Sequence, residues 1–492
     1  MSAPLRRSSL FDNSNRFQAN HRLSRPFSSL HCHPPHALGS PLYPPQIIES
    51  ETPSGRSSSD SDSSHLNDIE KGLPIHTIPS LGLQGGDQTH TQYGENKEYE
   101  ADCLEGKSVH GGDQNQPQPR LDFRSRLEHF TWAWYTLTMS TGGLSLLIYA
   151  QPHQFPGLRQ IGLAVYIINL VLFVLVTSAL LSRFYLFRGA FTRSLTHPRE
   201  GFFFPTFFLS IATIITSTQR YCVPEDPVLA RELTGPLLWV IQVAFWLYVG
   251  VTTSVAVGQY SYVFSAYSFG LQSMMPTWIL PIFPIMLSGT IASVISGTQP
   301  PEFAVAITVA GLTCQGLGIA VAFMMYAHMV GRLMQSGLPN REHRTGLFMC
   351  VGPPAFTALA FIGMARGLPE NFDHDMDGLW DARIIDTMGL VGAGFLWALS
   401  FWWFGIAVLA VIQSPPRHFH LGWWAAVFPN TGFTLATISL GSAFRSDTIL
   451  WFATAMSILL VLTYLFVLVH HVRAVIVQEI MYPGKDEDVE DH

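Results

Sequence analysis

The sequence predicts an all-α integral membrane protein with ten transmembrane helices, arranged as five repeated helical hairpins around a central pore. The first observation is composition, because 48% of the 492 residues are hydrophobic and only 13% are charged. An ordinary soluble protein of this length is less apolar. The second observation is that all four lysines lie outside residues 108–484. The third is a series of ten uncharged apolar windows, each about as long as the roughly 20 residues that a spanning helix needs.

The ten windows follow a repeat. They lie near residues 131–150, 161–182, 201–218, 236–264, 276–296, 303–327, 345–365, 387–412, 421–443 and 448–469. Successive odd-numbered windows begin 70, 75, 69 and 76 residues apart. A unit of two helices is therefore predicted to occur five times.

Helix-breaking residues recur in the odd-numbered windows, whereas the even-numbered windows carry no interior proline. In order, the breakers are Gly142–Gly143, Pro205, Pro281 with Pro284, Pro353–Pro354, and Pro429 followed by Asn430. A broken helix survives in lipid only where protein or a water-filled cavity satisfies the freed backbone groups. We therefore expect the odd-numbered helices to be kinked and to form an inner ring around the pore, with the even-numbered helices facing lipid.

The segments outside the windows predict the domain organisation and the topology. Residues 1–120 are rich in Ser, His, Pro and Gln, and we expect a disordered cytoplasmic tail. Residues 121–473 form the predicted ten-helix transport domain, and residues 474–492 a short cytoplasmic tail. Arginines concentrate in the short segments that lie on the side of the N-terminus, so both termini are predicted to be cytoplasmic.

The odd-numbered windows contain no Asp, Glu, Lys or Arg. A proton-driven pump usually needs an intramembrane carboxylate, and a metal cage needs charged ligands, so the sequence disfavours both. Hydroxyls, amides and the positive ends of broken helices remain, and these suit an anion. The predicted residues of the anion path are Thr141, Gly142, Gly143, Pro205, Ser210, Pro284, Ser288, Pro353, Pro354, Thr357, Pro429, Asn430 and Thr431. A Ser or Thr in a membrane helix can instead bond its own backbone or a neighbouring helix.

Three further residues are candidates for the path. Arg220 and Arg366 lie near the predicted external ends of the third and seventh helices, where they could attract anions or simply extend to the interface. Phe428 directly precedes the Pro429 break, and its ring could either close a narrow pore or pack between helices.

Other functions receive little support from the residues. The membrane region has no Ser-His-Asp constellation, metal-ligand spacing or phosphate-binding loop, so we expect neither an enzyme nor a bound cofactor or metal. No basic patch with interleaved aromatic residues indicates nucleic-acid binding. The expected partners are a small anion and the lipid bilayer.

Several motifs carry a resemblance to a known family. They are FTWAWYTLTMSTGG (130–143), PTWILPIFP (276–284), SGTQP (296–300), CQGLG (314–318), GLFMCVGPPAFTALAFIGMARG (346–367), GWWAAVFPNTGF (422–433) and MYPGKDED (481–488). With them the chain resembles the fungal malic acid transporters of the tellurite-resistance and dicarboxylate transporter family, whose wider relatives include the plant slow anion channels. The resemblance covers about residues 120–490 and leaves the N-terminal tail unmatched.

The resemblance implies ten helices in five hairpins, a plasma-membrane location, and transport of malate and related C4-dicarboxylates. It also implies that Phe428 matches the phenylalanine that plugs the pore in the channel branch, and that a homotrimer is possible. The resemblance also includes the fungal sulfite exporters of the same family, so the alternative function is an exporter of sulfite or another inorganic anion, or an anion channel. The segments VGPPAF (351–356) and FPNTGF (428–433) resemble the malate branch more closely.

Overall fold

The computed structural model describes residues 120–368, 372–373 and 381–485. Every regular element within these residues is a helix. The predicted N-terminal tail, residues 486–492 of the predicted C-terminal tail and most of the acidic loop between the seventh and eighth windows lie outside the described residues.

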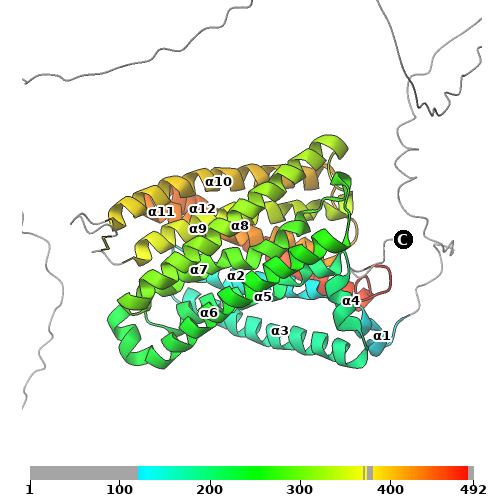
Figure 1. Ribbon diagram of the computed structural model, residues 1–492, viewed down its shortest axis with the longest axis horizontal. Coiled ribbons are helices and arrows are strands. Elements are labelled where there is room, and N and C mark those ends of the chain that lie inside the picture. The colour runs from blue at the N-terminus through cyan, green and yellow to red at the C-terminus, as the bar shows by residue number, and fades with distance from the viewer. Residues whose placement is uncertain (1–119, 369–371, 374–380, 486–492) are drawn as a thin grey trace, which may run out of the picture. The chain divides into compact units, whose positions relative to one another are not determined.

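The helices fall into an N-terminal and a C-terminal series. The first series is α1 (Phe123–Glu128), η1 (Trp132–Trp134), α2 (Tyr135–Tyr149), α3 (Leu158–Leu186), α4 (Ala190–Thr196), η2 (Glu200–Phe203), α5 (Pro205–Cys222), α6 (Pro227–Ala266), η3 (Leu271–Ser273), η4 (Pro276–Ile282) and α7 (Phe283–Ile295). The second is η5 (Ser296–Thr298), α8 (Pro301–Ser336), η6 (Arg341–Val351), α9 (Gly352–Gly367), α10 (Ala382–Gln413), η7 (Leu421–Ala426), α11 (Phe428–Ala443) and α12 (Asp447–Val477). The η elements are 3₁₀-helices. Figure 1 shows the long α-helices running alongside one another.

Eight helical segments in the described part of the chain are long and apolar enough to cross a membrane. They correspond to the predicted windows two to eight and ten. The first and ninth windows contain α2 and α11, which have 15 and 16 residues. α7 and α9 are equally short and reach spanning length only together with their 3₁₀ segments, whereas the segments that contain α2 and α11 are not among the eight. The predicted count of ten spanning helices is therefore not confirmed by length and hydropathy.

The predicted breaks take the form of a change in helix type. Each of α2, α5, α7, α9 and α11 is preceded by a 3₁₀ segment, and in the last four a proline occupies the first turn of the α-helix. At Pro429, the Val427 N–H donates to the Trp424 carbonyl at 3.0 Å, whereas the Thr431 N–H donates to the Val427 carbonyl at 2.9 Å. The bonding thus changes from i→i+3 to i→i+4. Proline is tolerated there because a first-turn N–H has no intrahelical partner.

Two details of the predicted breaks are wrong. Gly142 and Gly143 do not interrupt their helix, because α2 is continuous through both. They instead allow close helix packing, since a Cβ on Gly142 would lie 2.2 Å from Thr213 Oγ1. The even-numbered helices also include an interior proline. Pro236 lies inside α6, two residues after Thr234 leaves helical geometry with φ −125° and ψ 22°.

Burial alternates along the chain. In the segments that contain α5, α7 and α9, 72%, 83% and 83% of the residues in the most apolar window are buried. The corresponding shares in α3, α6, α8, α10 and α12 are only 22–44%. All but two residues of α2 are buried, as are all but three of α11. The helices α2, α5, α7, α9 and α11 are therefore inside, and the long helices α3, α6, α8, α10 and α12 present their apolar side chains outward.

The buried helices contact one another in chain order. α2 contacts α5, α5 contacts α7, α7 contacts α9, and α9 contacts α11; α11 in turn contacts α2.

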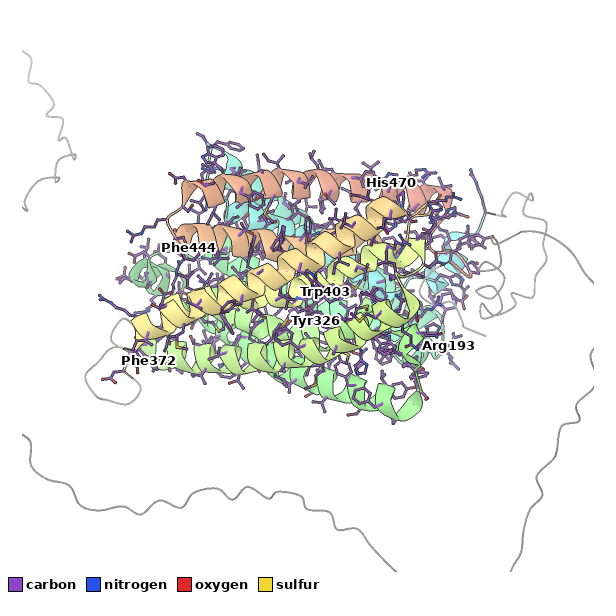
Figure 2. The ribbon with its side chains drawn as sticks, turned by 90° about the horizontal axis from the view of Figure 1, so that it is seen from above. Arg193, Tyr326, Phe372, Trp403, Phe444 and His470 are labelled. Atoms are coloured by element: carbon purple, nitrogen blue, oxygen red, sulfur yellow. The ribbon has the colours of Figure 1, made fainter. Side chains whose placement is uncertain are left out.

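The two ends of the described domain lie side by side, because the Leu121 N–H donates to Gln478 Oε1 at 3.1 Å and Arg126 Nη2 donates to the Val475 carbonyl at 2.7 Å. Figure 2 places Arg193 and His470 at one end of the helices, and Phe372 and Phe444 at the other.

A buried ion pair joins α3 to η2. Arg183 Nη1 lies 2.5 Å from Glu200 Oε1 and also donates to the Phe130 carbonyl at 3.0 Å. Both side chains are almost fully buried. Because an unpaired buried charge is strongly destabilising, the pair fixes the chain entering α2 and the chain entering α5 to the same point on α3.

We predict that Gly142→Ala destabilises the protein. The new methyl group would overlap Thr213 on α5, and overpacking of this kind typically costs about 1–3 kcal/mol. The expected result is a lower melting temperature in detergent and less protein at the membrane.

Gly250→Ala on α6 is the matched control, because nothing lies within 4 Å of the added Cβ. It should be neutral or stabilising, as alanine is the better helix former. Equal melting temperatures for the two variants would contradict close packing at Gly142.

Candidate functional site

Two cavities lie where the buried helices end. Their volumes are about 400 and 350 Å³, and both are lined by Arg220 from α5 and Arg366 from α9. Further walls come from the last turns of α2 and α7, and Leu435 and Ser439 of α11 line the smaller cavity. We call this pair the arginine mouth.

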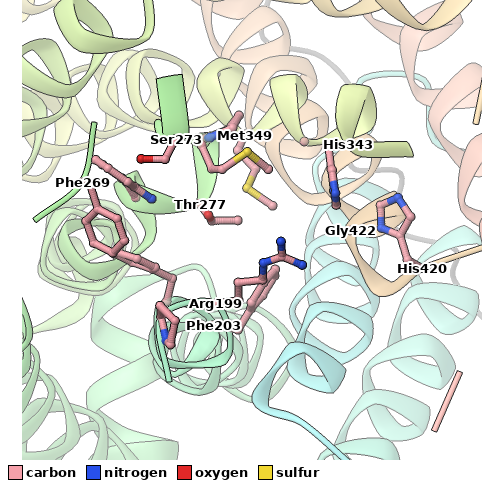
Figure 3. Close-up of a pocket in the computed structure, with 15 residues that line it drawn as sticks. Arg199, Phe203, Phe269, Ser273, Thr277, His343, Met349, His420 and Gly422 are labelled. Atoms are coloured by element: carbon pink, nitrogen blue, oxygen red, sulfur yellow. The ribbon is translucent and has the colours of Figure 1, made fainter. Parts of the chain in front are cut away.

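A third cavity, of about 280 Å³, lies where the same elements begin. Its walls come from the 3₁₀ segments η2, η4, η6 and η7 and from the residues just before them. Figure 3 shows the Arg199 side chain extending into the space between Thr277 and His343. The segment η4–α7–η5, for example, runs from Pro276 in this cavity to Thr298 in the arginine mouth. The cavities therefore lie at opposite ends of the same buried helices.

His420 also lines the cavity at the 3₁₀ end. Burial lowers the pKa of its imidazole to about 4, although a hydrogen bond with the Glu342 carbonyl acts in the opposite direction. The ring is therefore neutral at pH 7 and adds no positive charge to this cavity, in contrast to the Arg199 guanidinium.

Three phenylalanine rings from three helices meet between the two ends. Phe428 of α11 stacks on Phe356 of α9 with a centroid distance of 5.1 Å, and Phe283 of α7 lies 6.1 Å from Phe428 and 5.8 Å from Phe356. All three are at most 5% exposed. We call them the phenylalanine cluster.

Each ring of the cluster packs against a glycine of the next buried helix. A Cβ on Gly352 of α9 would lie 2.6 Å from Phe283, and one on Gly432 of α11 would lie 2.6 Å from Phe356. One on Gly143 of α2 would lie 3.3 Å from Phe428. Any larger residue at the first two positions would displace the ring. Phe428 has the loosest of the three contacts.

A cavity of about 20 Å³ borders the phenylalanine cluster on the side of the arginine mouth. All five buried helices contribute to its wall, which includes Phe356 and Phe428. It shares Leu146, Thr216 and Thr290 with the 350 Å³ cavity beyond it. We call it the threonine cavity, since its polar side chains are Thr213, Thr216, Thr290 and Thr431.

The structure brings together five of the residues predicted for the path. Gly143, Phe428 and Thr431 line the threonine cavity, and Arg220 and Arg366 line the arginine mouth. Arg220 also lies over the Tyr149 ring, with its guanidinium carbon 5.7 Å from the ring centroid. Both arginines occupy the last turn of their helices, where a cation also stabilises the negative end of the helix dipole.

The other predicted residues lie in contacts between or within helices and line none of these four cavities. They are Thr141, Gly142, Pro205, Ser210, Pro284, Ser288, Pro353, Pro354, Thr357, Pro429 and Asn430. Thr141 bonds Tyr464 of α12 at 3.0 Å, and Ser210 bonds Thr138 of α2 at 2.7 Å. Thr357 accepts a hydrogen bond from Gln315 at 2.7 Å. The Asn430 side chain donates to the Ala426 carbonyl at 2.8 Å.

Sequence reasoning missed Phe283 and Phe356 as neighbours of Phe428. A signal for Phe283 was present, since a Phe-Pro pair begins α7 as Phe283–Pro284 and α11 as Phe428–Pro429. Equivalent positions in a repeat meet when the repeated helices pack side by side. No comparable signal marks Phe356, which follows Pro353–Pro354 by two residues.

Comparisons with known proteins agree with this geometry. Residues 129–472 match the SLAC1 family, described as voltage-dependent anion channel. The chain is 34% identical over 381 residues to the malic acid transport protein of Schizosaccharomyces pombe, which covers 76% of this chain and 85% of the relative. It is 26% identical over 347 residues to the sulfite efflux pump SSU1 of Trichophyton rubrum, covering 70% and 89%.

A putative malic acid transport protein of Schizosaccharomyces pombe is also similar, with 30% identity over 377 residues, 76% of this chain and 86% of the relative. The family match covers most of the described helices, including every helix that lines a cavity. Together with the eight apolar helices, it makes the chain a multi-pass membrane protein. The chain belongs to the SLAC1 family of voltage-dependent anion channels.

Proposed function

We propose that this protein transports malate and related C4-dicarboxylate anions across the plasma membrane, through a central pore that Phe428 gates. The observation that carries the proposal is the placement of cavities at both ends of the same buried helices, with the phenylalanine cluster between them. The similarity to malic acid transport proteins supports the choice of substrate. A transporter, and not an enzyme, is the function that we propose.

The proposed pore is enclosed by five kinked helices, and ten helices in five hairpins cross the membrane. The contacts from α2 through α5, α7 and α9 to α11 and back to α2 support this arrangement. We propose that α2 and α11 cross together with their 3₁₀ segments, since Trp132–Tyr149 has 18 residues and Leu421–Ala443 has 23, close to the roughly 20 of a span.

The arginine mouth is the proposed entrance for anions from outside. Two guanidinium groups at one opening raise the local concentration of anions through their electrostatic field. No acidic side chain lines the 350 Å³ cavity, whereas Glu225 lines the 400 Å³ cavity. Glu225 accepts a hydrogen bond from Tyr149 at 2.6 Å and lies 3.4 Å from Arg159, which offsets its charge.

Phe428 is the proposed gate because its ring lines the threonine cavity and has the loosest glycine contact of the cluster. An apolar constriction excludes a hydrated anion because the anion would lose water without gaining polar partners.

The remaining proposals concern orientation and assembly. Both termini are proposed to be cytoplasmic. The hydrogen bond between Leu121 and Gln478 supports a location of both ends of the domain on the same side. A disordered N-terminal tail, the domain limits 121–473 and a homotrimer are also proposals. The trimer rests on the family resemblance alone.

The substrate is tested by expressing the full chain in a yeast strain that lacks malate uptake. We expect labelled malate to enter the cells, with no gain in sulfite tolerance. The alternative function, export of sulfite or another inorganic anion, is favoured by the similarity to the sulfite efflux pump. Sulfite tolerance without malate entry would select that alternative.

The orientation predicts where an epitope tag is accessible. A tag inserted between Glu370 and Asp381 should react with antibody on intact cells, because this loop is proposed to be external. Tags at either terminus should react only after permeabilisation. Labelling of a terminal tag in sealed cells would reverse the proposed orientation.

Phe428→Ala should increase malate flux per molecule at the cell surface, because it removes the ring that separates the cavities. Phe433→Ala is the control on the same helix. Phe433 packs against Trp397 and Phe404 and lines none of the four cavities. Its loss should cost about 3–5 kcal/mol, as is typical of buried Phe→Ala, and lower the surface amount without raising normalised flux.

The measurement is labelled malate uptake divided by surface protein for each variant. Unchanged or reduced normalised flux in the Phe428 variant would mean that the ring is only a packing element.

A further inference from the structure

The four threonines of the threonine cavity differ in what their hydroxyl groups do. Thr213 donates to the Ser210 carbonyl at 2.8 Å, Thr216 to the Ala212 carbonyl at 2.7 Å, and Thr431 to the Val427 carbonyl at 3.1 Å. Donation to a carbonyl three or four residues earlier is the usual behaviour of a helical threonine.

Thr290 of α7 does not follow this behaviour. Its Oγ1 is buried and has no hydrogen-bond partner among the described residues, and the side chain is only 8% exposed. Thr290 lines both the threonine cavity and the 350 Å³ cavity of the arginine mouth. Six other hydroxyl groups of the described residues are also buried without a partner, those of Thr131, Ser140, Ser288, Ser296, Thr308 and Thr345, but of these seven residues only Thr290 lines one of the four cavities.

The direction of the hydrogen bonds decides which threonine can hold an anion. A hydroxyl has one proton, and a threonine that donates it to a backbone carbonyl presents only lone pairs to the cavity. Lone pairs repel an anionic oxygen. Of the four threonines, only Thr290 therefore has a proton to donate.

We infer that Thr290 forms a binding subsite for one carboxylate oxygen of the transported anion, directly beyond the phenylalanine cluster. The volume of about 20 Å³ fits a single oxygen atom, since about 10–15 Å³ is needed for one water molecule. The rest of the anion would occupy the adjoining 350 Å³ cavity near Arg220 and Arg366. The inference rests on the proposed transport of carboxylates. It adds that the Thr290 hydroxyl group replaces one water molecule that the anion loses from its hydration shell.

The test compares Thr290→Val with Thr290→Ser in the full chain, using labelled malate uptake below saturation, normalised to surface protein. Valine has nearly the shape of threonine without the hydroxyl, whereas serine keeps it. A hydrogen bond to a charged group contributes enough that Thr290→Val should lower uptake on the order of tenfold. Thr290→Ser should stay within about threefold of the wild type, since it retains the donor.

Thr252→Val on α6 controls for the substitution itself. Thr252 is buried, donates to the Tyr248 carbonyl at 2.7 Å and lines none of the four cavities, so its normalised uptake should equal that of the wild type. Thr290→Val uptake equal to wild type, or equal loss in the valine and serine variants, would overturn the subsite.

The outcome separates this inference from the proposed function. A wild-type protein that carries no malate overturns the proposed substrate, and with it a carboxylate subsite. A wild-type protein that carries malate, together with a fully active Thr290→Val variant, overturns only the role of Thr290. If the wild type carries sulfite alone, loss of sulfite flux in Thr290→Val would assign the subsite to an inorganic oxyanion instead.

Discussion

The structure depends on the requirement that every backbone polar group within a membrane finds a partner inside the protein. The five buried helices begin with 3₁₀ segments, and four of them carry proline in the first α-helical turn. Such interruptions are costly against lipid and acceptable within protein. The long helices α3, α6, α8, α10 and α12 are buried over only 22–44% of their most apolar windows, and the helices that begin with 3₁₀ segments and proline lie inside them. The separation into inner and outer helices follows from backbone chemistry before any side chain is considered.

The same interruptions position two rings of the phenylalanine cluster. Phe283 and Phe428 each stand at the first residue of an α-helix, directly before a proline, so the start of the helix fixes where the ring points. The glycines Gly352, Gly432 and Gly143 then provide the space that the three rings occupy. Two rings of the phenylalanine cluster are thus placed by the first residue of a helix, and all three rings pack against glycines, which have no side chain. The three side chains contain no polar atom.

Electrostatics distinguish the two ends. The buried helices share one direction, so their positive dipole ends gather at the 3₁₀ segments and their negative ends at the arginine mouth. Arg220 and Arg366 counter those negative ends and leave the mouth suited to anions. The four threonines of the threonine cavity offer few hydrogen-bond donors to an anion. Thr213, Thr216 and Thr431 donate their hydroxyl protons to carbonyl groups of their own helices.

Sequence alone was sufficient for the membrane class and for the division into buried and exposed helices, whereas the five-fold two-helix repeat stays a prediction. The class and the division follow from hydropathy, spacing and proline, which are properties of neighbouring residues in the chain. The sequence also predicted Phe428, Arg220 and Arg366 as path residues, since a proline break and a helix end are local features, and their role stays a prediction. It overestimated Gly142–Gly143 as a break, because glycine permits a bend without requiring one and tertiary contacts with Thr213 favour the straight helix.

Only the tertiary structure decided which polar side chains face a cavity. Thr141, Ser210 and Thr357 bond neighbouring helices, whereas Thr290 has no such bond, and all four look alike in an apolar window. The burial of the Arg183–Glu200 pair and the place of Phe356 beside Phe283 and Phe428 also could not be predicted from the sequence. The physical reason is that hydropathy and helix breakers act along one chain segment, whereas the direction of a side chain depends on the rotation of its helix against neighbours that are distant in sequence.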